Sequence, residues 1–265
     1  LGGWHNRLSG FAMLEVIWQW YRPFVNEFRQ RFGLQPLRGA NFYHTLTSIP
    51  LLGASSPAVI RSAQDWPGSV HLTGYYFDEA QTDWQPSPDL QAFLDEGKPP
   101  IYIGFGSMAG RDPQRFAEIV LRALAKSGQR GILATGWGGL STLDVPENVF
   151  ILKEAPHGWL FPRMAAVVHH GGAGTTAEGL RAGMPSVVVP FIVDQLFWGK
   201  RVQGLGTGPE PIPARKLTAA NLAEAIDRVV NDPNMRERAE TLGRAIRAEN
   251  GVQTAVGIIR QHLGA

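Results

Sequence analysis

The sequence predicts an α/β protein whose larger part is a Rossmann-like parallel sheet with helices on both faces. From about residue 99 onward, short apolar strands alternate with amphipathic helices, which is typical of βαβ units. These strands are apolar on both sides, as in Ser186–Pro190, so both faces of the sheet are expected to be covered. Another strand, Ala165–His169, runs directly into a glycine-rich turn and a new helix.

The first element is expected to be an amphipathic helix over Gly10–Phe32. Its apolar residues recur at spacings of three and four. Pro23 inside the pattern predicts a kink or a break, and Gly33 is a suitable C-terminal stop. The three tryptophans near the start of the chain, Trp4, Trp18 and Trp20, are interpreted as core or interface packing. The alternatives are part of a hydrophobic acceptor pocket or a membrane-contacting face.

Two short strands are expected next, followed by a linker and the alternating region. The strands lie near residues 51–54 and 70–73, and the polar, proline-containing linker spans residues 78–88. The strands expected beyond the linker are 101–105, 131–135, 148–152, 165–169 and 186–190. Of the helices expected there, one begins at Asp112, one lies near His157 and one includes Glu178. Further helices are expected to close the chain, at 218–230, 234–248 and about 252–263.

Composition excludes several classes of protein. Twenty-five Lys and Arg against 23 Asp and Glu give a net charge of +2, which is small for a protein that grips nucleic acid, so no nucleic-acid partner is expected. A hydrophobic fraction of 44% with 18% charged residues argues against disorder. Cysteine is absent, which excludes disulfides and thiolate zinc sites and fits a cytoplasmic location.

The most informative stretch runs from His169 to Glu178. Glycines between a strand and a helix let a ligand approach the backbone, and the free N–H groups of the first helical turn attract an anion. His170 could donate a ring N–H, and Thr175 and Thr176 could donate hydroxyl groups. A tight turn without a ligand is the alternative. The turn is neither a P-loop nor a Gly-x-Gly-x-x-Gly fingerprint.

Two further polar signals stand at strand ends of the same sheet. Ser107 follows the strand 101–105, and Asp194 and Gln195 lie just beyond the strand 186–190. Open parallel sheets bind ligands outside the carboxyl ends of their strands. Glu178, one turn into the helix, is either a ligand residue or a carboxylate favoured by the helix dipole.

These residues resemble the donor-binding signature of family 1 glycosyltransferases, with the greatest likeness to the sterol glucosyltransferase branch. The resemblance lies in Ala155-Pro156-His157, in His170-Gly-Gly-Ala-Gly-Thr-Thr and in Pro190-Phe-Ile-Val-Asp-Gln195. Asp65-Trp-Pro67, Val70–Tyr75 and Phe105-Gly-Ser-Met108 also fit that branch. Glu154 departs from it, because the plant branch has a Trp at this place.

The resemblance implies a GT-B fold with a partial N-terminal acceptor domain over residues 1–77 and a donor-binding domain over residues 89–248. Residues 249–265 would then form a C-terminal helix that packs back on the first domain. The implied donor diphosphate ligands are Ser107, His170, Gly172, Ala173, Gly174 and Thr175. Ala155, His157 and Glu178 would flank the nucleoside, and Asp194 and Gln195 would bind the donor sugar.

The implied reaction is an inverting, metal-independent transfer of a hexose, expected to be glucose, from a UDP-sugar to a hydroxyl of a lipophilic acceptor such as a sterol. No cofactor is expected, since the UDP-sugar is a substrate, and the sequence has no Asp-x-Asp to hold a metal. The catalytic base is unknown and is expected upstream of Leu1, because the chain is expected to start inside its first domain. Peripheral membrane contact stays open.

Two alternatives remain. The chain could be a nucleotide-sugar-binding fragment without transfer activity, because the base is absent. It could also be a different GT-B enzyme, such as a nucleotide-sugar epimerase or a cell-wall N-acetylglucosaminyltransferase.

Overall fold

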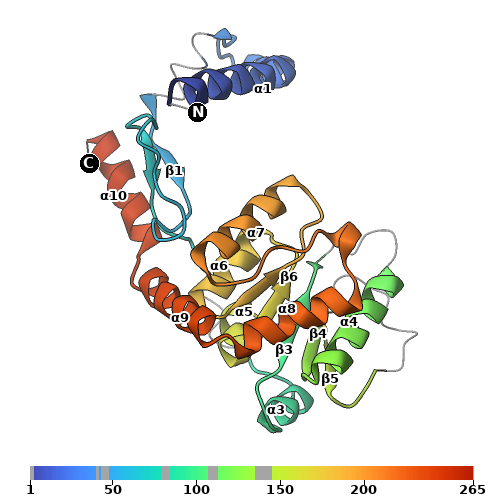
Figure 1. The fold of residues 1–265 in the computed structure, drawn as a ribbon. Helices are drawn as coiled ribbons and strands as arrows, with labels where there is room; N and C mark the ends of the chain where they lie inside the picture. The colour runs from blue at the N-terminus through green and yellow to red at the C-terminus, as the bar shows by residue number, and fades with distance from the viewer. Residues whose placement is uncertain are drawn as a thin grey trace. The chain divides into compact units, whose positions relative to one another are not determined.

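The computed structural model describes residues 3–39, 42, 48–78, 84–106, 113–134 and 145–264. The chain divides into two compact units (Figure 1). Unit 1 comprises Leu1–Tyr76 with Asn250–Ala265, and unit 2 comprises Phe77–Glu249. The domain limits expected from the sequence stay a prediction. In the described part of the chain, no helix is long and apolar enough to span a bilayer.

Unit 1 begins with helix α1, Gly3–Arg31, which continues through Pro23. The expected break at Pro23 is therefore wrong, and the helix ends before Gly33, whose φ of 66° suits glycine. Trp18 is buried and stacks on Phe42 with ring centroids 4.4 Å apart. Trp20 is exposed, and six other large apolar side chains of the helix are exposed or half-buried: Phe11, Leu14, Tyr21, Val25, Phe28 and Phe32.

The rest of unit 1 is a small parallel pair and a C-terminal helix. Strands β1, Leu51–Gly53, and β2, Val70–Leu72, pair in parallel with Leu51 opposite Val70, near the positions expected. Helix α10, Gly251–Leu263, is capped by Asn250, whose side chain accepts from the Gln253 amide. Gly251 lies so close to the Tyr75 carbonyl that a Cβ would collide with it.

Unit 2 is built on a five-stranded parallel sheet of order β5-β4-β3-β6-β7. This confirms the predicted Rossmann-like α/β class, and all five predicted strands are present. Their bounds are β3 Ile101–Gly104, β4 Gly131–Ala134, β5 Val149–Leu152, β6 Ala166–His169 and β7 Ser186–Val188.

Alternate residues of β3, β4, β5 and β6 enter two separate cores. Ile101, Ile103 and Val168 join one core with helices α4, Pro113–Ser127, and α8, Ala219–Asn231. Tyr102 and Val167 join the other, with Leu90 of α3, Pro88–Asp95, and with α5, His157–Leu160, and the 3₁₀ turn η2, Phe161–Arg163. Each fully buried aliphatic side chain contributes roughly 1.5–3 kcal/mol. The strands are therefore apolar on both faces because helices cover both.

The remaining helices carry the site and close the unit. Helix α6 spans Ala173–Arg181 and α7 spans Val193–Leu205. A short 3₁₀ turn, η3 (Ala214–Lys216), and α9, Pro233–Arg247, follow. Helix α3 was not expected from the sequence, although Ser87 caps it and Pro88 opens it in the usual way.

Candidate functional site

The chain reverses its direction across the sheet between β3 and β6. From β3 it proceeds to β4 and β5 on one side, and then returns to β6 and β7 on the other. Gly104, at the carboxyl end of β3, pairs with His169 at the end of β6. Ligands of open α/β sheets bind at this kind of switch point. The glycine-rich turn after β6 therefore occupies the favoured position.

The turn itself is held by His169 and by a glycine that needs positive φ. His169 is fully buried, and its Nδ1 accepts a hydrogen bond of 3.0 Å from the Gly171 amide. Gly171 has a φ of 87°, and a Cβ there would approach the Gln195 carbonyl within 2.8 Å. The turn is thus pressed against the start of α7. His169 is therefore a structural residue of the site.

Helix α6 presents free amides to this end of the sheet. Gly172 is its N-cap and offers no side chain to the first turn, and the first intrahelical bond runs from the Thr176 amide to the Gly172 carbonyl. The amides of Ala173, Gly174 and Thr175 precede that bond and carry the positive end of the helix dipole. Ala173 and Gly174 are exposed, and Thr175 is half-buried. This is the geometry of an anion site.

Thr176 does not contribute a ligand donor, although the sequence suggested one. It is buried, and its hydroxyl donates to the Gly172 carbonyl over 2.8 Å. The hydroxyl therefore secures the cap instead of facing the site.

His170 lies beside the first turn of α6. Its Nε2 is so close to Gly172 that a Cβ at that glycine would overlap it, and its Nδ1 is buried without a hydrogen-bond partner. Burial lowers the pKa of His170, and the nearby carboxylate of Asp194 partly offsets this. A neutral imidazole with a free polar atom at a helix N-terminus can donate an N–H to an anion.

The start of α7 brings the two expected sugar residues to the same end of the sheet, in different environments. Asp194 is exposed. Gln195 is buried, and its Oε1 accepts from the Phe191 and Ile192 amides over 2.7 and 3.2 Å. Its oxygen therefore shapes the loop, and a role for Gln195 in sugar binding, through its amide nitrogen, stays a prediction.

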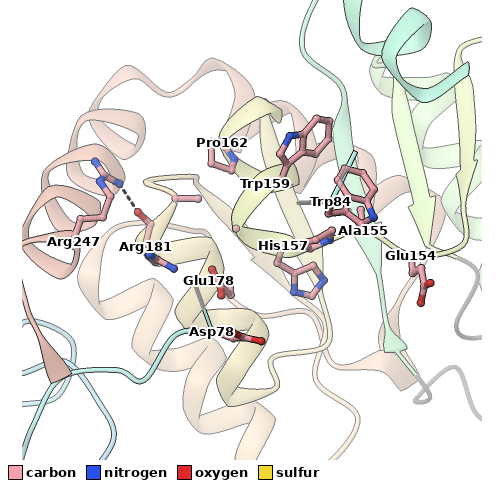
Figure 2. A pocket seen from close by; sticks show the side chains of 13 residues that line it. Asp78, Trp84, Glu154, Ala155, His157, Trp159, Pro162, Glu178, Arg181 and Arg247 are labelled. Carbon is pink, nitrogen blue, oxygen red and sulfur yellow. Dashed lines mark hydrogen bonds between the residues drawn. The ribbon is translucent and has the colours of Figure 1, made fainter. Parts of the chain in front are cut away.

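A cavity of about 1240 Å³ lies beside α6 and α5 and gathers the predicted nucleoside residues (Figure 2). Ala155, His157 and Glu178 line it. The Oε2 of Glu178 is buried without a partner, and burial raises the pKa of this carboxyl while Arg181 lowers it. A buried acceptor without a hydrogen bond lowers the stability of the fold. A ligand hydroxyl group that donates to this oxygen would supply the missing hydrogen bond.

A smaller cavity of about 210 Å³ continues from the nucleoside residues to the anion site, since Gly104, Gly106, His157, His170 and Thr175 all line it. His157 lines both cavities. The structure thus brings together all the predicted site residues that it describes. Ser107 lies outside the described residues.

His157 is held by aromatic neighbours that the sequence did not indicate. Its ring stacks on Phe161 at 4.4 Å and 16°, and its Nε2 lies 3.4 Å from the hydroxyl of buried Tyr102. Burial lowers the pKa of His157 to about 4, with His170 adding to the shift. The imidazole is therefore neutral at physiological pH.

Sequence reasoning missed the residues that enlarge the main cavity. Trp84, Trp159, Arg181, Arg247 and Asp78 also line it. Arg247 donates to the Arg181 carbonyl, as the dashed line in Figure 2 shows. The sequence did hold one signal for this cavity, a pair of tryptophans: Trp84 lies inside the polar linker, and Trp159 lies in α5, two residues after His157.

The described residues include no group of three or more His, Asp or Glu side chains arranged to hold a metal ion. Phosphate charge at this site would be met by the α6 amides and His170.

The chain is similar in sequence to several known proteins. A family model described as the C-terminal domain of erythromycin biosynthesis protein CIII-like proteins matches residues 130–259. The sterol 3-beta-glucosyltransferase UGT80B1 of Arabidopsis thaliana is 42% identical over 260 residues, which are 97% of this chain and 42% of that protein. The chain is thus similar over nearly its whole length to a part of a sterol 3-beta-glucosyltransferase.

The chain is also similar to a bacterial deoxyallosyltransferase. The O-mycaminosyltylonolide 6-deoxyallosyltransferase of Streptomyces fradiae is 39% identical over 258 residues, covering 97% of this chain and 60% of that protein. The chain therefore spans less than two thirds of the length of these curated relatives.

Solved structures of the GT-B type share the fold of this chain. The glycotransferase of kitacinnamycin matches 97% of this chain and 66% of its own, with a TM-score of 0.73 at 21% identity. CalG4, the calicheamicin glycosyltransferase, matches 95% of this chain and 64% of its own, with a TM-score of 0.68 at 20% identity. The predicted fold class is confirmed.

Proposed function

We propose that this chain carries the donor-binding part of an inverting, metal-independent glycosyltransferase that moves a hexose, expected to be glucose, from a UDP-sugar to a hydroxyl of a lipophilic acceptor such as a sterol. The observation that carries the proposal is the start of α6. Its free amides and His170 stand together at the switch point of a parallel sheet.

The proposed binding mode assigns each part of the donor to residues that the structure describes. The diphosphate would lie on the amides of Ala173, Gly174 and Thr175, with His170 donating a ring N–H. The ribose would donate its hydroxyl groups to Glu178, whose Oε2 has no other partner. The base would enter the cavity beside Ala155 and His157. Asp194 would accept hydroxyl groups of the sugar.

These groups suit the departure of a nucleoside diphosphate. Negative charge grows on the diphosphate as the glycosidic bond breaks, and fixed N–H dipoles stabilise such charge without reorganising. Hydrogen bonds to charged groups contribute roughly 1.5–3 kcal/mol each. The described residues thus bind and orient the donor. We assign no general base among them.

The acceptor class rests on the relatives. The plant relatives are named sterol 3-beta-glucosyltransferases, and the Streptomyces relative is named for transfer to O-mycaminosyltylonolide. The sterol in the plant names is a lipophilic alcohol, which is the acceptor class proposed for this chain.

Calorimetry against UDP, UDP-glucose and dTDP-glucose tests the proposal. We expect binding of UDP and UDP-glucose at micromolar to millimolar strength, with dTDP-glucose weaker. Absence of UDP binding by folded protein would refute it. A parallel assay for sterol glucoside separates an active transferase from a protein that only binds the donor.

A further inference from the structure

The nucleoside end of the main cavity lacks an aromatic side chain at position 154, because a glutamate occupies it. Three aromatic side chains line the cavity nearby: Trp84, His157 and Trp159 (Figure 2). Stacking on an aromatic ring is a usual means of holding a nucleobase. A ring can stack on a nucleobase only if one of its faces is free.

Two of the three rings already have a face covered. The guanidinium of Arg163 lies 4.0 Å above the ring centroid of Trp159, and Arg163 also donates to the Trp159 carbonyl over 2.6 Å. The ring of His157 lies against Phe161, nearly parallel at 16°. Each contact takes up one aromatic face and fixes the ring in place.

Trp84 differs from the other two. Its ring contact is with Trp159, at 4.8 Å between centroids but tilted by 60°, so the neighbour meets it obliquely. Trp84 is half-buried and packs against the core that holds Tyr102 and Phe161. Four residues later α3 begins, capped by Ser87, which accepts from the Leu90 amide over 3.3 Å. Packing against this core therefore holds the indole in place, and the indole still lines the cavity.

We propose that Trp84 is a binding residue whose indole forms the aromatic wall for the nucleobase of the bound nucleoside diphosphate. The inference rests on the proposed donor site. Under this inference, the segment before α3 contacts the base, and α6 holds the phosphates independently. The ligand class is a nucleoside diphosphate with a pyrimidine base.

The test compares a ligand that has a base with one that lacks it. Dissociation constants for UDP and for inorganic pyrophosphate are measured by calorimetry on the whole chain, for wild type and for Trp84→Leu. Loss of one stacked base weakens binding about 10-fold, so UDP should weaken by that factor in Trp84→Leu. Pyrophosphate should bind equally to both proteins.

Two further variants serve as controls. Trp84→Phe keeps an aromatic face and should retain UDP binding within about threefold. Trp20→Leu removes a tryptophan that is 77% exposed on α1 and should change neither ligand. Should Trp84→Leu fail to fold, the fluorescence of Trp84→Phe decides the matter: UDP should quench the wild type and quench this variant much less.

The outcomes separate this inference from the proposed function. Unchanged UDP affinity in Trp84→Leu, or equal quenching in wild type and Trp84→Phe, would overturn the role of Trp84 alone. An equal loss of UDP and pyrophosphate would also overturn it, because the tryptophan would then support the whole site. Failure of wild type to bind either ligand would overturn the donor site itself.

Discussion

At the scale of single residues, the site contains three neighbouring histidines with different tasks. His169 shapes the turn, His170 faces the start of α6, and His157 lies between the two cavities. Burial lowers the pKa of all three. Neutral imidazoles can donate one N–H each, so the site depends on hydrogen bonds more than on fixed positive charge.

His170→Ala should weaken UDP binding far more than His157→Ala. Removing a hydrogen bond to a charged phosphate costs roughly 1.5–3 kcal/mol, or about 10- to 100-fold in affinity. In the proposed binding mode His157 makes no contact with the phosphates. Titration calorimetry of both variants provides the comparison, and equal losses would show that the diphosphate lies elsewhere.

Acid should destabilise the fold through His157 and His169. Burial lowers their pKa values to about 4 and about 3, from 6.5 in the unfolded chain. Between pH 6.5 and 4 the unfolded chain binds more protons, so the free energy of unfolding falls as pH falls. Between pH 7 and 5, the free energy of unfolding of His157→Gln should therefore fall by about 2 kcal/mol less than that of wild type.

Denaturant unfolding at the two pH values measures this difference. His262→Gln, on the exposed end of α10, is the matched control and should keep the wild-type dependence. An identical acid loss in wild type and His157→Gln would contradict the burial of a neutral His157.

At the scale of elements, the glycines of the strand-to-helix turn differ sharply in what surrounds them. A Cβ at Gly172 would overlap His170, whereas a Cβ at Gly174 would meet nothing within 4 Å. Both stand at the start of the same helix. Alanine substitutions at the two glycines therefore separate a steric effect on His170 from a general effect on the stability of α6.

Gly172→Ala should displace His170 and weaken pyrophosphate binding about 10-fold or more. Gly174→Ala should leave the fold intact and stabilise it by up to roughly 1 kcal/mol without ligand, because alanine favours helices. Calorimetric affinities and unfolding free energies of the two variants give the result. Equal affinities would mean that His170 is not held by this turn.

Sequence reasoning predicted the sheet of unit 2 well because its signal is local. Strands such as Ala166–His169 are apolar runs next to glycines, and their order along the chain implies parallel pairing. Helix α1 was predicted less well, because one proline did not break a helix of 29 residues. Trp84 and Tyr102 were missed because their place in the site depends on packing between distant segments.

At the scale of the whole molecule, every described residue of the proposed donor site belongs to unit 2, Phe77–Glu249. Two separate helix starts, α6 and α7, meet at one end of its sheet, with Gly171 against Gln195. Binding of a nucleotide should therefore stabilise unit 2 as a whole.

UDP should raise the melting temperature of the chain. A ligand at 100 times its dissociation constant adds about 2.7 kcal/mol to the folded state, which corresponds to several degrees for a domain of this size. Differential scanning calorimetry with increasing UDP records the shift, and uridine, which lacks phosphates, should produce much less. Equal shifts with UDP and uridine would indicate that the phosphates make no contact.

The most direct measurement follows the backbone amides themselves. In an NMR titration of the whole chain with inorganic pyrophosphate, the account predicts that the largest and saturable shifts belong to the amides of Ala173, Gly174 and Thr175, and that His170→Ala reduces them. Saturable binding that leaves these amides unmoved while others shift would contradict the proposal that the start of α6 holds the diphosphate.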